Sequence, residues 1–183
     1  ESGAYKEYSH EMVKILTEEG IDRHADVSLT YHRRYGNVEV IVARVIKADG
    51  TIVDVGDELI TDGTPPALSA MNIYETDFRQ RTIVFPQLEA GDGIELLTIS
   101  DYSKPLIENG FAGIYPMQSI SPIMESSLTV QGPADMPLHH IAKGEGLEFQ
   151  ESAVVEEPGE GRGENWQYYT WMSKDVPQID PEP

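Results

Sequence analysis

The stretch NVEVIVARVIKADGTIVDV, residues 37–55, decides the fold class, because it combines the two clearest β-sheet signals in the chain. Val38, Val40 and Val42 alternate with residues that would point the other way, as expected of a half-buried strand. Asp49-Gly50 then supplies the positive backbone torsions that a tight hairpin turn needs. The stretch therefore predicts two antiparallel strands joined by a short turn.

Short β-branched and aromatic segments recur along the whole chain, separated by Gly, Pro and Asp. Tyr5–Leu16 is predicted as a strand turned by the residues TEEG, although Ser9 could cap a helix over SHEMVKILTEE. This rhythm predicts an all-β fold with little helix, a two-sheet β-sandwich that forms a single domain over residues 1–183. Further strands are expected at Asp26–Tyr31, Arg81–Phe85, Ile94–Tyr102, Ile114–Ser119, Glu125–Val130, Leu138–Ala142, Leu147–Gln150 and Gln167–Met172.

Two stretches are predicted as connections. Residues 61–80 form a long connection, because Pro65-Pro66 cannot donate sheet hydrogen bonds; a short helix is expected around Leu68–Met71. Residues Glu156–Trp166 are rich in glycine and acid, which predicts a mobile hairpin loop.

The charge of the chain excludes some partners. With 13 basic and 32 acidic residues the formal charge is −19, which would repel nucleic acid and anionic membrane surfaces. High solubility explains the charge most simply, while a saline environment and cation binding remain as alternatives. No apolar run is long enough for membrane insertion, and the absence of cysteine excludes disulfides and a cysteine nucleophile.

Most candidate chemical motifs fail on spacing. HEMVK begins like a zinc-protease motif, but Lys14 stands where the second histidine should be. His139-His140 would point to opposite faces of a strand, which disfavours a shared metal ion. The sequence contains neither a Gly-x-Ser-x-Gly elbow nor a phosphate-binding loop. We therefore predict no catalytic, cofactor-binding or metal-binding residues.

Gly91-Asp92-Gly93 invites three interpretations, namely a calcium loop, a phosphate cradle and a turn. The glycines occupy positions where an EF-hand needs side-chain ligands, and a strand-like segment follows where a phosphate site needs a helix. A turn that leads into a strand explains the residues best. On that basis we expect Gly91→Ala to cost about 1–2 kcal/mol and Asp92→Asn to cost less.

Four segments together resemble a known family. ARVIKADGTIVDV, YETDFRQRTIVFPQLEAGDGIELL, YPMQSISPIMESSLTV and YYTWMSKDVPQIDPEP are similar, in order and spacing, to domain of unknown function number 3857, which precedes transglutaminase-like domains in exported bacterial proteins. The matching residues are Tyr74, Arg79, Pro86, Leu88, Gly91, Asp92, Ile94, Glu95, Trp171, Asp175, Pro177, Glu182 and Pro183.

The resemblance implies an immunoglobulin-like or related β-sandwich without catalytic residues of its own. It also implies an exported (periplasmic or cell-envelope) protein, trimmed here at its N-terminus and continuing past Pro183 into a transglutaminase-like domain. We expect an accessory module, not an enzyme, which packs against that domain and is monomeric by itself. Its possible domain-interface or structural residues are Tyr74, Asp77, Arg79 and Trp171. Arg79 could meet the partner domain, or pair with an acid such as Asp77 or Glu95.

A ligand-binding module for carbohydrate or peptide is the alternative, because the chain is well supplied with aromatic residues. Alternation places Tyr169 and Trp171 on one strand face and Tyr168 on the other, and one of these faces should be core. This argues against a single aromatic platform built from Tyr74, Phe78, Tyr115, Trp166, Tyr168, Tyr169 and Trp171.

Overall fold

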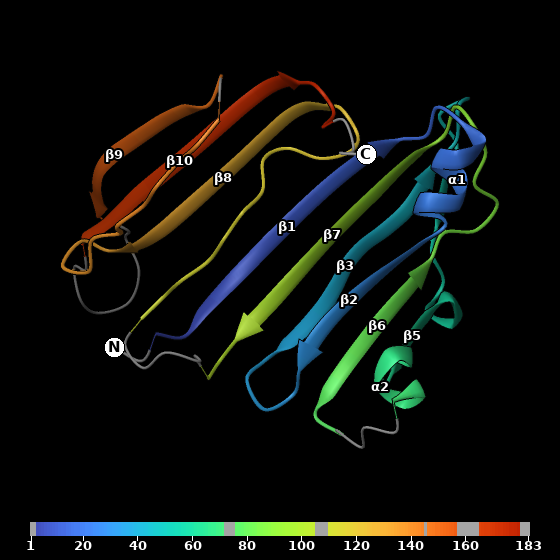
Figure 1. Cartoon of the computed structure of the whole chain (residues 1–183), viewed down its shortest axis with the longest axis horizontal. Helices are drawn as coiled ribbons and strands as arrows, with labels where there is room; N and C mark the ends of the chain where they lie inside the picture. The colour runs from blue at the N-terminus through green and yellow to red at the C-terminus, as the bar shows by residue number, and fades with distance from the viewer. Residues whose placement is uncertain (1–2, 72–75, 105–109, 145, 157–164, 180–183) are drawn as a thin grey trace. The chain divides into compact units, whose positions relative to one another are not determined.

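The computed structural model describes residues 3–71, 76–104, 110–144, 146–156 and 165–179 and confirms the all-β fold (Figure 1). Within these ranges ten strands form three antiparallel sheets, and only short helices interrupt them. The elements are β1 (Tyr5–Lys14), α1 (Glu18–His24), β2 (Asp26–His32), β3 (Asn37–Ile46), β4 (Ile52–Asp54), η1 (Asp57–Leu59), β5 (Ile60–Gly63), α2 (Pro66–Ala70), β6 (Phe78–Val84), β7 (Gly93–Tyr102), β8 (Ile123–Pro133), β9 (Glu148–Glu156) and β10 (Asn165–Val176).

The chain divides into two compact units, Glu1–Ala112 and Gly113–Pro183. The first unit holds the first sheet, with strand order β1-β7-β3-β4, and the second sheet, with order β2-β6-β5. The second unit holds the third sheet, with order β8-β10-β9. The expectation of one domain over residues 1–183 stays a prediction.

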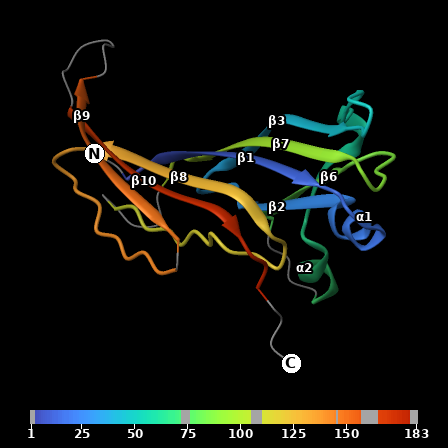
Figure 2. The same ribbon diagram turned by 90° about the horizontal axis from the view of Figure 1, so that it is seen from above.

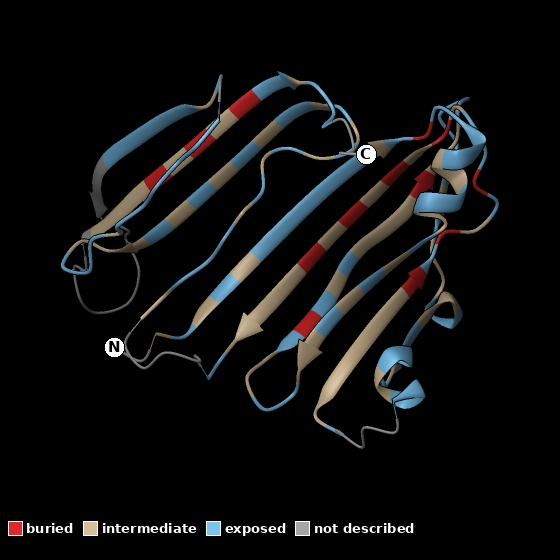
Figure 3. Cartoon of the chain, in the orientation of Figure 1, coloured by how far each residue is buried: buried red, intermediate tan, exposed pale blue. Residues whose placement is uncertain are grey.

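The first unit is a sandwich of two sheets around one hydrophobic core. Alternate residues of β7 are buried, which Figure 3 shows as bands along the strand, and Ile94 and Leu96 pack with Val45 of the same sheet. Ile83 of the second sheet belongs to the same cluster, so the two sheets face each other across it; Figure 2 shows β1 and β7 in one layer and β2 in the other. Burial of one such aliphatic side chain stabilises the fold by roughly 1.5–3 kcal/mol.

The hairpin of residues 37–55 is present, but one of its expected core positions is wrong. Gly50 has φ +88°, as the predicted turn requires. The pairing of β3 with β7 shifts between Val40 and Val42, so that Ile41 is an extra residue. Because the bulge reverses the alternation, Ala43 joins the core with Val40, while Val42 lies opposite Leu97 on the outer face.

The first segment is a strand, as predicted, and not a helix. β1 pairs along its whole length with β7, from Tyr5 opposite Tyr102 to Lys14 opposite Gly93. The TEEG stretch is more than a turn, because Thr17 accepts a hydrogen bond from Gly20 N and caps the seven-residue helix α1. Thr17 is a typical N-cap residue, so the predicted turn at TEEG is corrected to the start of a helix.

The stretch 61–80 is less irregular than expected. β5 ends only at Gly63, and β6 begins at Phe78, three residues before the predicted Arg81. Asp62 and Gly63 are typical turn residues, yet they pair with Arg81 and Gln80 at the sheet edge. The predicted short helix is α2, which begins at Pro66, two residues before the expected Leu68.

The third sheet contains the predicted hairpin of β9 and β10, in which Asn165 lies opposite Glu156. Residues 157–164 of the predicted loop lie outside the described residues. The strands expected at Ile114–Ser119 and Leu138–Ala142 are absent from these described segments. β-Branched composition favours a strand only where a neighbouring strand is available, and Leu138 N instead donates to the Tyr169 hydroxyl at 3.1 Å.

Candidate functional site

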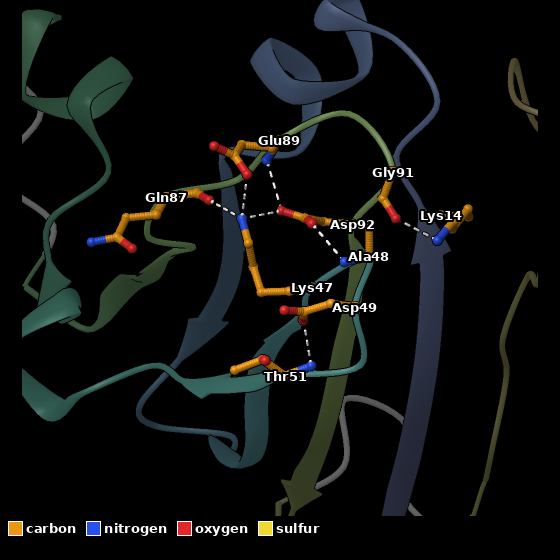
Figure 4. Close-up of polar contacts among 9 residues, drawn as sticks. All are labelled: Lys14, Lys47, Ala48, Asp49, Thr51, Gln87, Glu89, Gly91 and Asp92. Atoms are coloured by element: carbon orange, nitrogen blue, oxygen red, sulfur yellow. Dashed lines mark hydrogen bonds and ion pairs between the residues drawn. The ribbon is translucent and has the colours of Figure 1, made fainter.

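Asp92 of the Gly91-Asp92-Gly93 turn is bonded to Lys47, Ala48 and Glu89, and we call this set of contacts the lock (Figure 4). The Asp92 carboxylate is 1 % exposed and accepts hydrogen bonds from Lys47 Nζ at 2.7 Å, Glu89 N at 2.8 Å and Ala48 N at 3.1 Å. Burial alone would raise the pKa of Asp92, but these bonds outweigh it and lower the pKa below its usual range. Both carboxylate oxygens are engaged by donors, which leaves this group unsuited to a calcium ion.

Gly91 has the left-handed torsion expected of a turn residue, with φ +101°. Its N–H donates to Ile15 O at 2.8 Å, and Ile15 N donates to Asp92 O at 2.9 Å. The turn thus holds the end of β1 as well as the start of β7, which confirms the turn interpretation. The expected order of stability effects stays a prediction, but the burial of Asp92 and its three hydrogen bonds favour the reverse order, with the larger cost at Asp92.

Among the possible interface residues, Tyr74 lies outside the described residues. The Asp77 carboxylate pairs with Arg34 NH2 at 3.2 Å. The Asp77 carbonyl accepts a backbone hydrogen bond from Arg33 N at 2.8 Å. Asp77 therefore ties the turn after β2 to the start of β6.

Arg79 pairs with Asp62, which the sequence had not suggested. Its Nε donates to Asp62 Oδ1 at 2.7 Å, and its NH2 donates to the Asp62 carbonyl at 2.9 Å. The two acids considered for it, Asp77 and Glu95, pair instead with Arg34 and Arg44. This contact favours the structural interpretation of Arg79, with a different partner.

A polar clamp surrounds Asp62 at the inner face of the second sheet. The Tyr31 hydroxyl donates to Asp62 Oδ2 at 2.7 Å, and Arg81 NH2 lies 3.3 Å from the same oxygen. Arg81 NH1 also donates to the carbonyl of Val38 in the first sheet. Burial opposes ionisation of Asp62, but Tyr31 and Arg79 outweigh it and lower its pKa. Arg81 therefore links the two sheets where the apolar core ends.

Trp171 is a core residue of the second unit. It is 6 % exposed, and its ring packs against Phe149 at 5.2 Å and against His140 at 5.1 Å between ring centroids. Tyr169 lies on the same face and is also buried, whereas Tyr168 is on the other face, as the alternation predicted. Tyr168, Tyr169 and Trp171 are therefore divided between the two faces of β10, which argues against a single aromatic platform.

The outer face of the first sheet carries apolar residues where a two-layer sandwich usually has polar ones. Tyr8 and Met12 of β1 are 68 % and 65 % exposed, and Ile52 of β4 is 51 % exposed. Between them the strand pairing places half-buried apolar side chains, including Leu97 and Ile99. At the centre Glu95 accepts from Arg44 at 2.6 Å and contacts His10 at 3.0 Å. We call this surface the outer face.

A hollow of about 210 Å³ lies at the end of the sandwich that contains the Asp62 clamp. Its walls include the side chains of Tyr5, Tyr31, Tyr35 and Tyr102, and Lys104 stands among its lining residues. Sequence analysis missed this site, because Tyr5, the neighbours Tyr31 and Tyr35, and Tyr102 lie in three separate parts of the chain. The outer face had a detectable signal, since Leu97 and Ile99 make β7 apolar on both faces.

The described residues contain neither a metal-ligand cluster nor a membrane-spanning helix. Among the described residues, no group of three or more His, Cys, Asp or Glu is placed to hold a metal ion. None of the helices described has the length and apolar character needed to cross a lipid bilayer.

Comparison with known proteins identifies similar sequences and folds. The family described as Domain of Unknown Function with solved structure (DUF3857) matches residues 1–180. A crystal structure from Parabacteroides distasonis ATCC 8503, described as a putative protease, superposes with a TM-score of 0.71 at 18 % identity and covers 98 % of this chain. This chain spans only 34 % of that chain. No curated protein matches the sequence.

Proposed function

Because the chain belongs to the DUF3857 family of domains of unknown function, we propose that it is a non-catalytic accessory module that packs against a protease-like or transglutaminase-like domain of an exported protein. The observation that carries this proposal is the apolar outer face of the first sheet. Exposed apolar side chains gathered on one face of a sheet are typical of interaction sites. The occupant we propose is the catalytic domain of the same polypeptide.

The fold comparison supports a partner on the same polypeptide. The similar crystal structure belongs to a chain about three times as long as the part this sequence covers, since the covered share is 34 %. Its description as a protease applies to that protein, and we extend only the accessory role to this chain. Export and a monomeric state of the isolated module are further parts of the proposal, and they follow from the family resemblance.

The chemistry of three paired carboxylates also supports a structural role. Asp92, Asp62 and Glu95 each accept hydrogen bonds from a lysine or arginine of a different strand or loop. Cationic donors that hold a carboxylate ionised stabilise a fold, whereas a general base needs a pKa near the working pH. These three acids are thus suited to tying strands together.

The coding sequence after Pro183 gives the first test. We expect it to encode a domain with a cysteine, histidine and aspartate set, as in transglutaminase-like enzymes. A stop codon shortly after Pro183 would rule out the accessory role on the same polypeptide.

Association of the two parts gives the second test. Chain 1–183 and the remainder of the natural polypeptide are made separately and mixed, and their binding is measured by titration calorimetry. We expect the double variant Tyr8→Ser, Met12→Ser to weaken binding at least about tenfold, because buried apolar contacts are lost. Ile141→Ser serves as a matched control, since Ile141 is 88 % exposed but lies in the other unit.

Two results would contradict the proposal. One is association that the outer-face variant leaves unchanged while Ile141→Ser weakens it. The other is hydrolytic or acyl-transfer activity in purified chain 1–183, which would make the chain an enzyme by itself.

A further inference from the structure

The tyrosine-lined hollow has the size of a binding site for one ring. The Tyr5 and Tyr102 rings stack with centroids 4.4 Å apart, and the Phe111 ring meets Tyr5 edge-on at 5.0 Å. A volume of about 210 Å³ exceeds the roughly 150 Å³ that holds a benzene molecule in an apolar cavity. The space therefore suits a single ring-bearing group and not a drug-sized molecule.

The backbone around the hollow is held in place. Lys104 N donates to Tyr35 O at 3.1 Å, which places Lys104 beside the turn that follows β2. In that turn Gly36 is needed, because a Cβ there would lie 1.9 Å from Asp101 O. The Arg81 guanidinium lies over the ring of Tyr31, which lines the hollow, at 5.7 Å from the ring centroid. These contacts hold the Tyr31–Gly36 part of the wall in place, and a preformed wall favours binding.

The charge of the hollow differs from that of the rest of the protein. The chain has 32 acidic residues, yet none of the described residues that line the hollow is Asp or Glu. Lys104 is the one lysine or arginine among the described residues that line the hollow. No described carboxylate forms an ion pair with Lys104. Burial and, after it, the nearby Glu7 carboxylate raise the pKa of the Tyr102 hydroxyl, so one carboxylate lies close to the hollow without being part of its described lining. The Tyr31 hydroxyl donates to Asp62, but Arg79 and Arg81 offset that carboxylate, so Lys104 is the cation of the described lining that is left for an anionic ligand.

We propose that this hollow binds the C-terminal residue of a peptide, with a ring-bearing side chain among the tyrosines and the terminal carboxylate at Lys104. Aromatic walls bind rings through apolar contact and edge-to-face packing, and an ammonium group pairs with a carboxylate. The proposal does not depend on the accessory role, because it concerns a different surface of the first unit.

Two other ligand classes fit the hollow less well. A quaternary ammonium group would favour an aromatic cage, but Lys104 would repel it. A sugar site usually adds carboxylate and amide side chains to its aromatic rings, and beside the tyrosine hydroxyls and His32 the described lining supplies one amide, Asn37, and no carboxylate. Both classes serve as outcomes of the test.

The test uses N-acetyl-L-phenylalanine as the probe and amide NMR shifts of chain 1–183 as the readout. We expect saturable shifts at residues 35–38 and 102–104 with a Kd of about 1 mM. The neutral N-acetyl-L-phenylalaninamide should bind about fivefold more weakly, because it lacks the carboxylate. N-Acetyl-L-alanine, which lacks the ring, should produce no saturable shifts.

Two variants separate the carboxylate from the ring. Lys104→Gln should abolish the difference between acid and amide, whereas Lys174→Gln, a lysine of the second unit, should preserve it. Tyr35→Ser should weaken acid and amide alike by about tenfold, because it removes a ring wall. Melting curves of each variant verify that the fold is intact.

Several results would overturn the proposal. These are equal binding of acid and amide to the unmodified chain, binding of N-acetyl-L-alanine as tight as that of the phenylalanine probe, and shifts that map outside the hollow. Equal or stronger binding of methyl glucoside or choline at the same residues would assign the hollow to another ligand class. None of these results bears on whether the outer face binds a catalytic domain.

Discussion

The two ends of the sandwich in residues 1–112 are built differently, although β3 and β7 reach both of them. At the Gly93 end, the turn 86–92 closes the core, and the Asp92 carboxylate accepts hydrogen bonds from Lys47 and from two backbone N–H groups. At the Tyr102 end, the Asp62 clamp takes the place of apolar packing and a hollow remains. One end is a closed lock and the other is open, which is why we assign stability to the first and binding to the second.

The largest effect is expected from breaking the lock. Asp92→Ala removes the acceptor of three hydrogen bonds and leaves Lys47 without its buried partner. We expect the free energy of unfolding to fall by about 3 kcal/mol. Urea denaturation measures this loss, and Asp49→Ala is the control, because Asp49 accepts only a local turn bond from Thr51 N. An equal loss in both variants would contradict the lock.

A smaller effect is expected from breaking the clamp at the open end. Arg81→Met keeps the aliphatic stem but removes the bonds to Asp62 and to the Val38 carbonyl. We expect a loss of about 2 kcal/mol in the free energy of unfolding, because Asp62 keeps Arg79 and Tyr31 as partners. The same denaturation experiment measures it. Arg33→Met should cost less, because within the described residues the Arg33 guanidinium donates one hydrogen bond, to the Thr76 carbonyl.

The turn glycine should matter less than Asp92. Gly91→Ala places a Cβ at φ +101°, 3.4 Å from the Ala48 side chain, and we expect a cost of about 1–2 kcal/mol. The order of unfolding midpoints, with Asp92→Ala below Gly91→Ala, checks this. A reversed order would contradict the role of Asp92 as the buried acceptor that holds this turn.

The smallest difference between the two ends is expected in their pH dependence. Asp92 and Asp62 both have pKa values lowered from the usual 3.8, so each contributes stability above that pH. The contribution is lost as the pH falls through the lowered pKa, because protonation then favours the unfolded chain. Stability measured by urea between pH 7 and pH 2 should therefore decline only below about pH 4 on account of these groups. Asp92→Asn and Asp62→Asn should each flatten the decline, and a flat curve in the unmodified protein would contradict both assignments.

Local sequence signals predicted much of the fold. The Asp-Gly hairpin, the strand β7 and the turn at Gly91 depend on alternation and on backbone torsions, which neighbouring residues encode. The separation of Tyr169 and Trp171 from Tyr168 followed from the same alternation. Alternation failed at Ile41, because a bulge depends on how two strands pair and not on either strand alone.

The candidate sites were harder to predict, because their residues meet only in the folded chain. Arg79 was expected to have an acidic partner, but 32 acids were available and the strand register selected Asp62. The family resemblance identified Gly91 and Asp92 as a pair without indicating that one sets the turn and the other is buried. The tyrosine hollow had no local signal.

By itself, the sequence determined the all-β class, the position of most strands and the family, because strand periodicity and turn torsions are local properties. The tertiary structure decided which charges pair, that Asp92 is buried, that β3 bulges at Ile41, and that Tyr5, Tyr35 and Tyr102 surround one hollow. The physical reason is that burial and ion pairing depend on contacts between residues tens of positions apart, as between Lys47 and Asp92 or Tyr5 and Tyr102. Sheet pairing selects these contacts, and no short window of sequence contains them.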